Sequence, residues 1–210
     1  MDRSRPGGCH DRRPGNAFSG GLAAAKEGAR GEVSDRALRA LTETAGTMSR
    51  ALLSLGSNLG DRLAFLQSAV DAVLPAVVAV SSVYETKAWG VEDQPDFLNA
   101  VVLVDDPARD HWDWLRTGQA AEQAAERVRE LRWGPRTLDV DIVTVDGVRS
   151  DDPRLLLPHP GTPERASVLI PWLEIEPGAV LPGHGPIADL LTARPASDRD
   201  SVRLTSLTLA

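Results

Sequence analysis

The order of the apolar patterns along the chain constrains its fold more than any other feature. From residue 51 onward, strand-like runs and helix-like periodicities alternate as strand, helix, strand, strand, helix, strand. The expected strands are Ala51–Leu55, Val77–Tyr84, Leu98–Val104 and Thr137–Val145. One helix should follow Asp61 as its cap, and another should run from Asp106-Pro107 to about Glu126. This order predicts an α+β fold of the ferredoxin-like sandwich type, with a mainly antiparallel sheet flanked by helices.

Shorter patterns follow these six elements. A glycine turn at residues 56–60 should connect the first strand to the first helix, and residues 86–95 should form a long loop. A proline-rich loop, Pro158–Pro163, precedes the apolar segment Val168–Ile175. A short helix is expected near Ala188–Thr192.

The first 47 residues differ in composition from the rest. They are rich in Gly, Ala, Arg and Ser and hold few large apolar side chains, so they could not bury enough surface to offset the entropy of ordering. We therefore expect residues 1–47 to be a disordered or low-complexity extension and residues 48–210 to be the folded domain. Met48 leaves a second interpretation open, in which the natural chain starts there.

Charge and composition exclude several kinds of partner. Residues 1–48 hold 8 of the 23 basic and 6 of the 30 acidic residues, so residues 49–210 carry a net charge of −9. An acidic domain is a poor partner for nucleic acid or anionic lipid. No apolar run is long enough to span a membrane, and no signal-peptide core is visible. The lone Cys9 cannot form an internal disulfide, and we expect a cytoplasmic protein.

The last expected strand, Thr137–Val145, alternates apolar and acidic residues. Alternate residues of a strand share a face, so Leu138, Val140 and Ile142 should face the core while Asp139 and Asp141 face the other way. Magnesium is bound through a few carboxylates, water and substrate phosphates. The pair is compatible with a magnesium site, but by itself the pattern is more typical of an exposed polar face or of charges at a strand end.

Four arginines precede this strand within ten positions, and their planar guanidinium groups match phosphate oxygens. They are Arg127, Arg129, Arg132 and Arg136. Arginines beside a pair of carboxylates favour a site for a metal-bridged polyphosphate. The alternative is a solvated face on which they pair with Glu122, Glu126 and Glu130. The chain has no Walker A pattern, so a triphosphate would have to be held in another way.

Six segments carry a more specific signal. They are Ser54–Asp61 (SLGSNLGD), Ser81–Thr86 (SSVYET), Asp93–Val102 (DQPDFLNAVV), Arg132–Ile142 (RWGPRTLDVDI), Pro158-His159-Pro160 and Val168–Pro177 (VLIPWLEIEP). In this order they resemble motifs of the 6-hydroxymethyl-7,8-dihydropterin pyrophosphokinases of folate synthesis. The resemblance covers about residues 50–185, and RWGPRTLDVDI together with DQPDFLNA is its most specific part.

The resemblance implies a role for each matching position. The metal ligands would be Asp139 and Asp141, and the catalytic arginines Arg127 and Arg136. The ATP-binding positions would be Glu122, Arg129, Arg132, Trp133, Arg136, Ile142, Arg154, His159 and Arg165. The pterin-binding positions would be Thr86, Lys87, Trp89, Phe97 and Asn99.

The same resemblance implies the chemistry. The enzyme would use two Mg²⁺ ions to transfer the terminal diphosphate of ATP to the hydroxymethyl group of 6-hydroxymethyl-7,8-dihydropterin, releasing AMP. Its partners would be these two small molecules, with no nucleic acid or membrane, and it would act as a monomer.

One position departs from the family pattern. Two residues after Arg165 the family usually has a second aromatic that closes a sandwich on the pterin, whereas this chain has Ser167. Stacking on an aromatic side chain is worth roughly 1–3 kcal/mol per base in nucleic-acid systems, so its loss could weaken pterin binding. A catalytically weakened pterin- and ATP-binding relative is therefore the main alternative, and a nucleic-acid-binding module that uses the arginines is the second.

Overall fold

The computed structural model describes residues 50–88, 94–127 and 134–210, all of which belong to one unit, Gly46–Ala210. The expected N-terminal extension, residues 1–47, lies outside the described residues. In the part of the chain that the structure describes, no helix is both long enough and apolar enough to cross a membrane.

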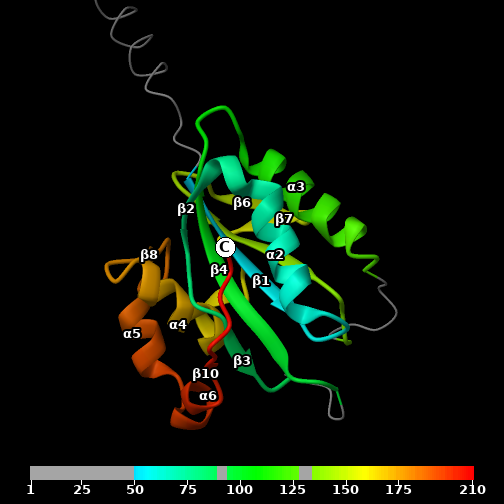
Figure 1. The fold of residues 1–210 in the computed structure, drawn as a ribbon. Coiled ribbons are helices and arrows are strands. Elements are labelled where there is room, and N and C mark those ends of the chain that lie inside the picture. The colour runs from blue at the N-terminus through cyan, green and yellow to red at the C-terminus, as the bar shows by residue number, and fades with distance from the viewer. Residues whose placement is uncertain (1–49, 89–93, 128–133) are drawn as a thin grey trace, which may run out of the picture. The chain divides into compact units, whose positions relative to one another are not determined.

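A six-stranded antiparallel sheet forms the centre of the described residues (Figure 1). Its strands are β1 (Arg50–Ser57), β2 (Val77–Val80), β3 (Tyr84–Thr86), β4 (Phe97–Asp105), β5 (Asp139–Val145) and β10 (Arg203–Leu204). They are ordered β10-β3-β4-β1-β5, and β2 pairs with the other half of β4. Helix α2 (Arg62–Val73) follows β1, and helix α3 (His111–Ala124) follows β4. This arrangement confirms the predicted ferredoxin-like sandwich.

One face of the sheet packs against α2 and α3, which stand together on one side of the strands in Figure 1. Alternate strand residues such as Leu53, Leu55, Val102 and Val140 point into this layer and are buried there with Trp114 of α3. Leu138 and Ile142 are buried in the same layer, which confirms the predicted core face of the last strand.

The opposite face is covered over only part of its area. Leu52, Val101 and Val143 pack under α4 (Ala166–Ile175) and α5 (Ile187–Ala193), with Trp172 of α4 fully buried among them. Further along the strands the same face changes from apolar to polar residues, because Asp139 and Asp141 share their side of β5 with Val143. The candidate site lies on this polar part.

Two predicted elements differ most in their bounds, and the last strand begins at Asp139, two residues after the expected Thr137. Helix α3 begins at His111 and not at Asp106, because Asp110 and Asp113 form a capping box, whereas Asp106 closes a turn by accepting the N–H of Ala108 at 3.0 Å. The helix ends at Ala124, and Glu126 adopts a left-handed φ of 53°. The expected strand Val77–Tyr84 is divided into β2 and β3.

The division between β2 and β3 has a local cause. Ser81 lies in the break, where its hydroxyl accepts the backbone N–H of Val101 at 2.9 Å and its own N–H donates to the Val101 carbonyl at 3.0 Å. The side chain takes part in the ladder that the backbone alone would otherwise make.

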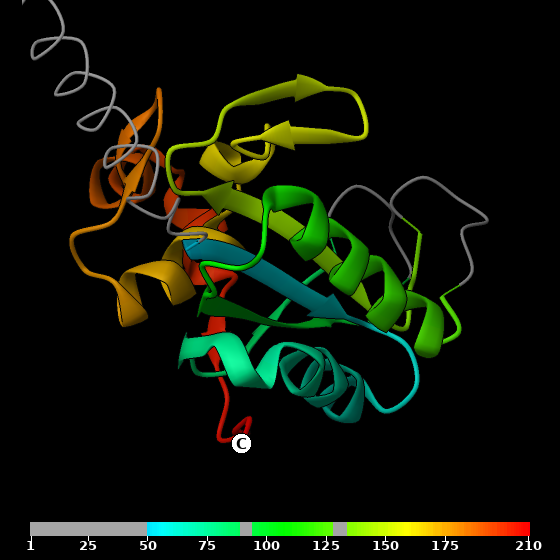
Figure 2. The same ribbon diagram turned by 90° about the horizontal axis from the view of Figure 1, so that it is seen from above.

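Short elements complete the described chain. They are the 3₁₀ turns η1 (Leu74–Ala76) and η2 (Thr162–Glu164), the hairpins β6 (Ser150–Asp152) with β7 (Leu155–Leu157) and β8 (Val180–Leu181) with β9 (Gly185–Pro186), and helix α6 (Ala196–Asp200). The β6–β7 hairpin forms a separate two-stranded sheet, drawn in yellow in Figure 2. After β10 the chain ends beside α2 in both views, and the N–H of Ala210 donates to Gln67 Oε1 at 2.8 Å.

Candidate active site

A cavity of about 500 Å³ lies on the polar part of the sheet face, a size within the usual range for small-molecule sites. Its floor consists of strand residues: Ser54 and Gly56 from β1, Thr86 from β3, Phe97 and Asn99 from β4, and Asp139 and Asp141 from β5. Its walls are Lys87, Arg136, residues 159–161, residues 164–168 and three residues near the C-terminus. Segments far apart in sequence thus converge on one hollow.

Strand register determines how the floor residues are arranged. Asn99 pairs with Gly56 across β4 and β1, and Gly56 pairs with Asp139 across β1 and β5. Gly56 therefore separates the amide from the carboxylate without filling the space between them. A Cβ at Gly56 would lie 3.6 Å from Asn99 Oδ1 and 3.7 Å from the Phe97 ring, so a side chain there would occupy the middle of the floor.

The two carboxylates are held by cationic side chains. Asp139 lies 2.6 Å from an Nη of Arg127 and 3.0 Å from Nε of Arg136. Asp141 accepts a hydrogen bond from Arg165 at 3.0 Å, and the Nε2 of His159 lies 3.8 Å from its other oxygen. Three of the predicted arginines, Arg127, Arg136 and Arg165, are therefore brought together with both carboxylates.

The donor set fits Mg²⁺, which prefers oxygen ligands and often keeps only one or two protein carboxylates beside substrate phosphates. Asp139 and Asp141 both line the cavity and stand two positions apart on one strand face. No group of three or more His, Cys, Asp or Glu side chains among the described residues could hold a metal ion. A magnesium ion here would thus need phosphate or water oxygens to complete its coordination.

Glu122 supports this cluster from beneath. Its side chain is 9% exposed, forms an ion pair with Arg127 and accepts the N–H of Val140 at 3.0 Å. Val140 lies between the two carboxylates, so Glu122 fixes both the backbone of β5 and the guanidinium group. Glu122 does not line the cavity, which differs from its predicted place among the ATP-binding residues. Its pair with Arg127 is part-buried, unlike the solvated pairs of the alternative interpretation.

Asn58 connects two segments of the site and was not singled out by sequence reasoning. Its side chain donates to the Pro95 carbonyl at 3.1 Å and to Gln94 Oε1 at 3.0 Å, and it accepts the N–H of Arg136 at 2.8 Å. Its own N–H donates to the Arg136 carbonyl at 3.1 Å. The available signal was its position in the turn after β1, inside the SLGSNLGD motif.

The end of the cavity near β3 combines an aromatic ring with amide and hydroxyl groups. Asn99 donates to Thr86 Oγ1 at 2.9 Å, which orients the amide over the floor. Phe97 is largely buried, and the guanidinium of Arg136 lies over its ring at 4.9 Å. Such a surface can stack a flat heterocycle and hydrogen-bond its edge. Lys87 lines the rim, whereas the predicted Trp89 lies outside the described residues.

His159 stands beside Asp141 in the wall. Burial lowers the pKa of His159 below its usual value of 6.5; the Asp141 carboxylate opposes this shift, while the Arg165 charge adds to it. Its Nδ1 accepts the N–H of Gly161 at 3.2 Å, so the neutral ring carries its hydrogen on Nε2. That hydrogen faces the acidic side of the cavity.

Several predicted site residues are not brought into the cavity. Ile142 is buried in the layer under α2 and α3. Arg154 is 74% exposed, is bonded to Asp152 at 2.8 Å and lies over the Trp112 ring at 4.7 Å. The remaining three, Arg129, Arg132 and Trp133, lie outside the described residues.

Residues near the C-terminus add a wall that the sequence did not predict. Ser167 at the start of α4 lines the cavity, and so do Asp198, Ser201 and Val202. These last three lie beyond the six motifs, so no motif marked them.

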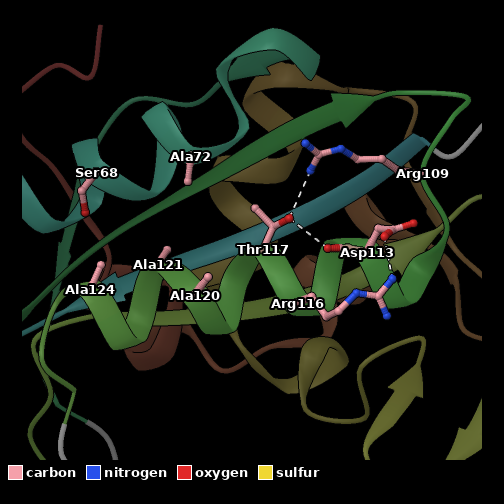
Figure 3. A pocket seen from close by; sticks show the side chains of 9 residues that line it. All are labelled: Ser68, Ala72, Arg109, Asp113, Arg116, Thr117, Ala120, Ala121 and Ala124. Carbon is pink, nitrogen blue, oxygen red and sulfur yellow. Dashed lines mark hydrogen bonds and ion pairs between the residues drawn. The ribbon is translucent and has the colours of Figure 1, made fainter.

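A second hollow of about 620 Å³ lies between α2 and α3 (Figure 3). Ser68 and Ala72 contribute to it from α2, and alanines line much of the α3 side. Its charged groups already pair locally, as Arg116 does with Asp113 at 2.6 Å and Arg109 with Asp106 at 3.2 Å. The hollow therefore lacks the converging polar groups of the first cavity.

Comparisons with known proteins indicate the family. Residues 52–177 match the model of the 7,8-dihydro-6-hydroxymethylpterin-pyrophosphokinase family. A 2-amino-4-hydroxy-6-hydroxymethyldihydropteridine pyrophosphokinase from Mycobacterium tuberculosis is 46% identical over 169 residues, covering 75% of this chain and 90% of that protein. The Mycobacterium leprae protein of the same name is 48% identical over 175 residues, covering 77% and 92%. The Pseudomonas aeruginosa protein of that name is 41% identical over 152 residues, covering 70% and 93%.

Solved structures support the fold. The crystal structure of wild-type Plasmodium falciparum HPPK-DHPS with pterin and p-hydroxybenzoate matches with a TM-score of 0.53 at 13% identity. The match covers 73% of this chain and 44% of that one. This chain thus corresponds to less than half the length of the Plasmodium protein, and at this identity the likeness concerns the fold alone.

Proposed function

Because the chain belongs to the 7,8-dihydro-6-hydroxymethylpterin-pyrophosphokinase family, we propose that it transfers the terminal diphosphate of ATP to 6-hydroxymethyl-7,8-dihydropterin in folate biosynthesis. The observation that carries the proposal is the set of residues that line one cavity. Carboxylates and arginines gather at the β5 side, and an aromatic ring and an amide lie at the β3 side. These are the two kinds of surface that a triphosphate and a pterin need.

Asp139 and Asp141 would hold two Mg²⁺ ions. Bound magnesium would neutralise phosphate charge and hold the triphosphate in a defined shape. The pair is supported by its place on one strand face beside cationic side chains.

Arg127, Arg136 and Arg165 would move from carboxylate to phosphate partners when the nucleotide binds. Each now contacts Asp139 or Asp141, and a guanidinium matches a phosphate as well as it matches a carboxylate. Arg127 and Arg136 would then stabilise the charge that grows on the bridging and equatorial oxygens. His159, with its hydrogen on Nε2, would contact ATP as a donor.

The reaction itself needs correct alignment. The hydroxymethyl oxygen attacks the β-phosphorus, a new O–P bond forms, and the bond from that phosphorus to the α–β bridging oxygen breaks. AMP leaves with the electron pair of that bond and with the bridging oxygen, while the hydroxyl proton is released to water. Phe97 would stack on the pterin ring and Asn99 would read its edge, which brings the hydroxymethyl group toward the triphosphate.

The remaining roles are proposals of the same kind. Arg129, Arg132 and Trp133 would contribute to the nucleotide side and Trp89 to the rim of the pterin side. The enzyme would act as a monomer and in the cytoplasm. None of the comparisons favours a catalytically weakened relative.

A direct assay tests the proposal. The full chain is incubated with MgCl₂, ATP and 6-hydroxymethyl-7,8-dihydropterin, and nucleotides are separated by chromatography. We expect AMP to form only when both the pterin and magnesium are present. Formation of ADP, or of AMP at the same rate without pterin, would contradict it. Light scattering during size-exclusion chromatography measures the oligomeric state.

A further inference from the structure

We propose that residues 198–202 form the outer wall of the pterin half of the cavity and that Val202 contacts the pterin ring. The inference rests on the proposed function, since it assigns a substrate contact within the same site. It concerns a segment that lies beyond residues 52–177, the part of the chain that matches the family model.

The register of β10 places Val202 beside the pterin floor. Arg203 pairs with Glu85 and Leu204 pairs with Tyr84, so Val202, one position earlier, lies alongside Thr86. Thr86 in turn pairs with Phe97. Val202 thus continues the row that contains the hydroxyl and the aromatic ring of the pterin half, and it lines the cavity with them.

Val202 supplies an apolar side chain to the pterin half of the cavity. A flat ring stacked on Phe97 leaves open the edge that points along this row toward Thr86, and apolar contact at that edge excludes water from the stack. Ser167 lines the cavity but is small and polar. The branched methyl groups of Val202 are the apolar alternative that the C-terminal segment supplies.

The wall is anchored at both ends, as a binding surface must be. After Val202, the Thr205 N–H donates to the Val83 carbonyl at 3.0 Å, and Arg203 lies 3.2 Å from both Glu85 and Asp96. Before Val202, Asp198 is paired with Arg194 at 2.9 Å. Asp96 directly precedes Phe97, so the same segment that holds Val202 also ties down the start of β4.

The test compares Val202→Ala with Leu204→Ala, a matched control in the same segment. Leu204 is 65% exposed and does not line the cavity. Binding of 6-hydroxymethyl-7,8-dihydropterin and of ATP is measured separately by calorimetry on the full chain, and the KM of each substrate is determined. We expect Val202→Ala to raise the pterin Kd about fourfold and to change ATP binding less than twofold. The substitution removes two half-buried carbon groups, which together equal one buried CH₂ at ~0.8 kcal/mol. Leu204→Ala should leave both unchanged.

Two outcomes would overturn the inference: equal pterin affinity in the two variants, or an equal loss of ATP and pterin affinity in Val202→Ala. If Val202→Ala lowers the melting temperature too far for binding to be measured, Val202→Thr keeps the shape and replaces one methyl group by a hydroxyl, and it should weaken pterin binding in the same selective way. Wild-type protein that forms no AMP would contradict the proposed function itself. Active wild type with an unaffected Val202→Thr contradicts this inference alone.

Discussion

Replacement of Glu122 tests whether the buried ion pair beneath β5 holds the site together. Glu122→Ala leaves the guanidinium of Arg127 with Asp139 alone among the contacts described above, and it leaves the Val140 N–H without its carboxylate acceptor. Removal of one partner from a buried ion pair costs about 3–5 kcal/mol, because the other charge stays buried. We therefore expect Glu122→Ala to lower the free energy of unfolding by about 3–5 kcal/mol.

Glu122→Gln separates the two functions of the side chain. The amide oxygen can still accept the Val140 N–H, while the charge that pairs with Arg127 is lost. A neutral hydrogen bond is worth about 0.5–1.5 kcal/mol net, so the glutamine variant should keep part of the stability lost in the alanine variant. Turnover should fall in both variants, because the backbone between Asp139 and Asp141 is no longer held as firmly.

Urea denaturation followed by circular dichroism measures these differences, with Glu126→Ala as the control. Glu126 lies one turn further on and is exposed, so its removal should change stability by less than about 0.5 kcal/mol. A loss below 1 kcal/mol in Glu122→Ala, or equal losses in the alanine and glutamine variants, would refute the reasoning.

Four further predictions follow from the site. Asn58→Ala removes the three side-chain hydrogen bonds by which Asn58 connects Gln94 and Pro95 to Arg136. The variant should lose about 2–4 kcal/mol of stability and have a lower kcat. An unchanged kcat in a variant that melts normally would show that these hydrogen bonds have no role in turnover. Asp141→Asn should abolish magnesium-dependent AMP formation while circular dichroism stays unchanged, and full activity would contradict the metal assignment. Ser167→Phe should tighten pterin binding about tenfold in a fluorescence titration, and unchanged or weaker binding would count against a missing stacking partner. Burial lowers the pKa of His159, so its contribution to stability is present above pH 6.5 and is lost as the pH falls through the folded-state pKa. Wild type should therefore lose more stability on acidification than His159→Gln, as measured by urea denaturation of both proteins over a series of pH values. The same dependence of stability on pH in the two proteins would argue against this role.

The fold could be predicted because the core strands obey simple periodicity. Leu138, Val140 and Ile142 alternate with two carboxylates, and the structure buries the first set and exposes the second set to a cavity. The first and last residues of each helix and strand were harder to predict from the sequence. Asp106-Pro107 and Asp110 are both plausible helix starts, and only the reciprocal bonds between Asp110 and Asp113 decide between them.

Sequence reasoning singled out residues that line the cavity where one continuous segment supplies them. The segment that ends in Asp139 and Asp141 carries its chemistry in adjacent residues, so motif and spacing suffice. Val202 reaches the cavity only because β10 pairs with β3, a contact between residues more than a hundred positions apart that no local pattern records. Asn58 was missed for a related reason, since its partners lie in two loops far along the chain.

The transfer of an intact diphosphate can be measured with ATP labelled with ³²P at the β-position. The full chain is incubated with this nucleotide, Mg²⁺ and 6-hydroxymethyl-7,8-dihydropterin, and the products are separated chromatographically. Attack at the β-phosphorus predicts that the label appears in the pterin product and that the AMP released is unlabelled. Label retained in a nucleotide product, with a single phosphate on the pterin, would contradict the account.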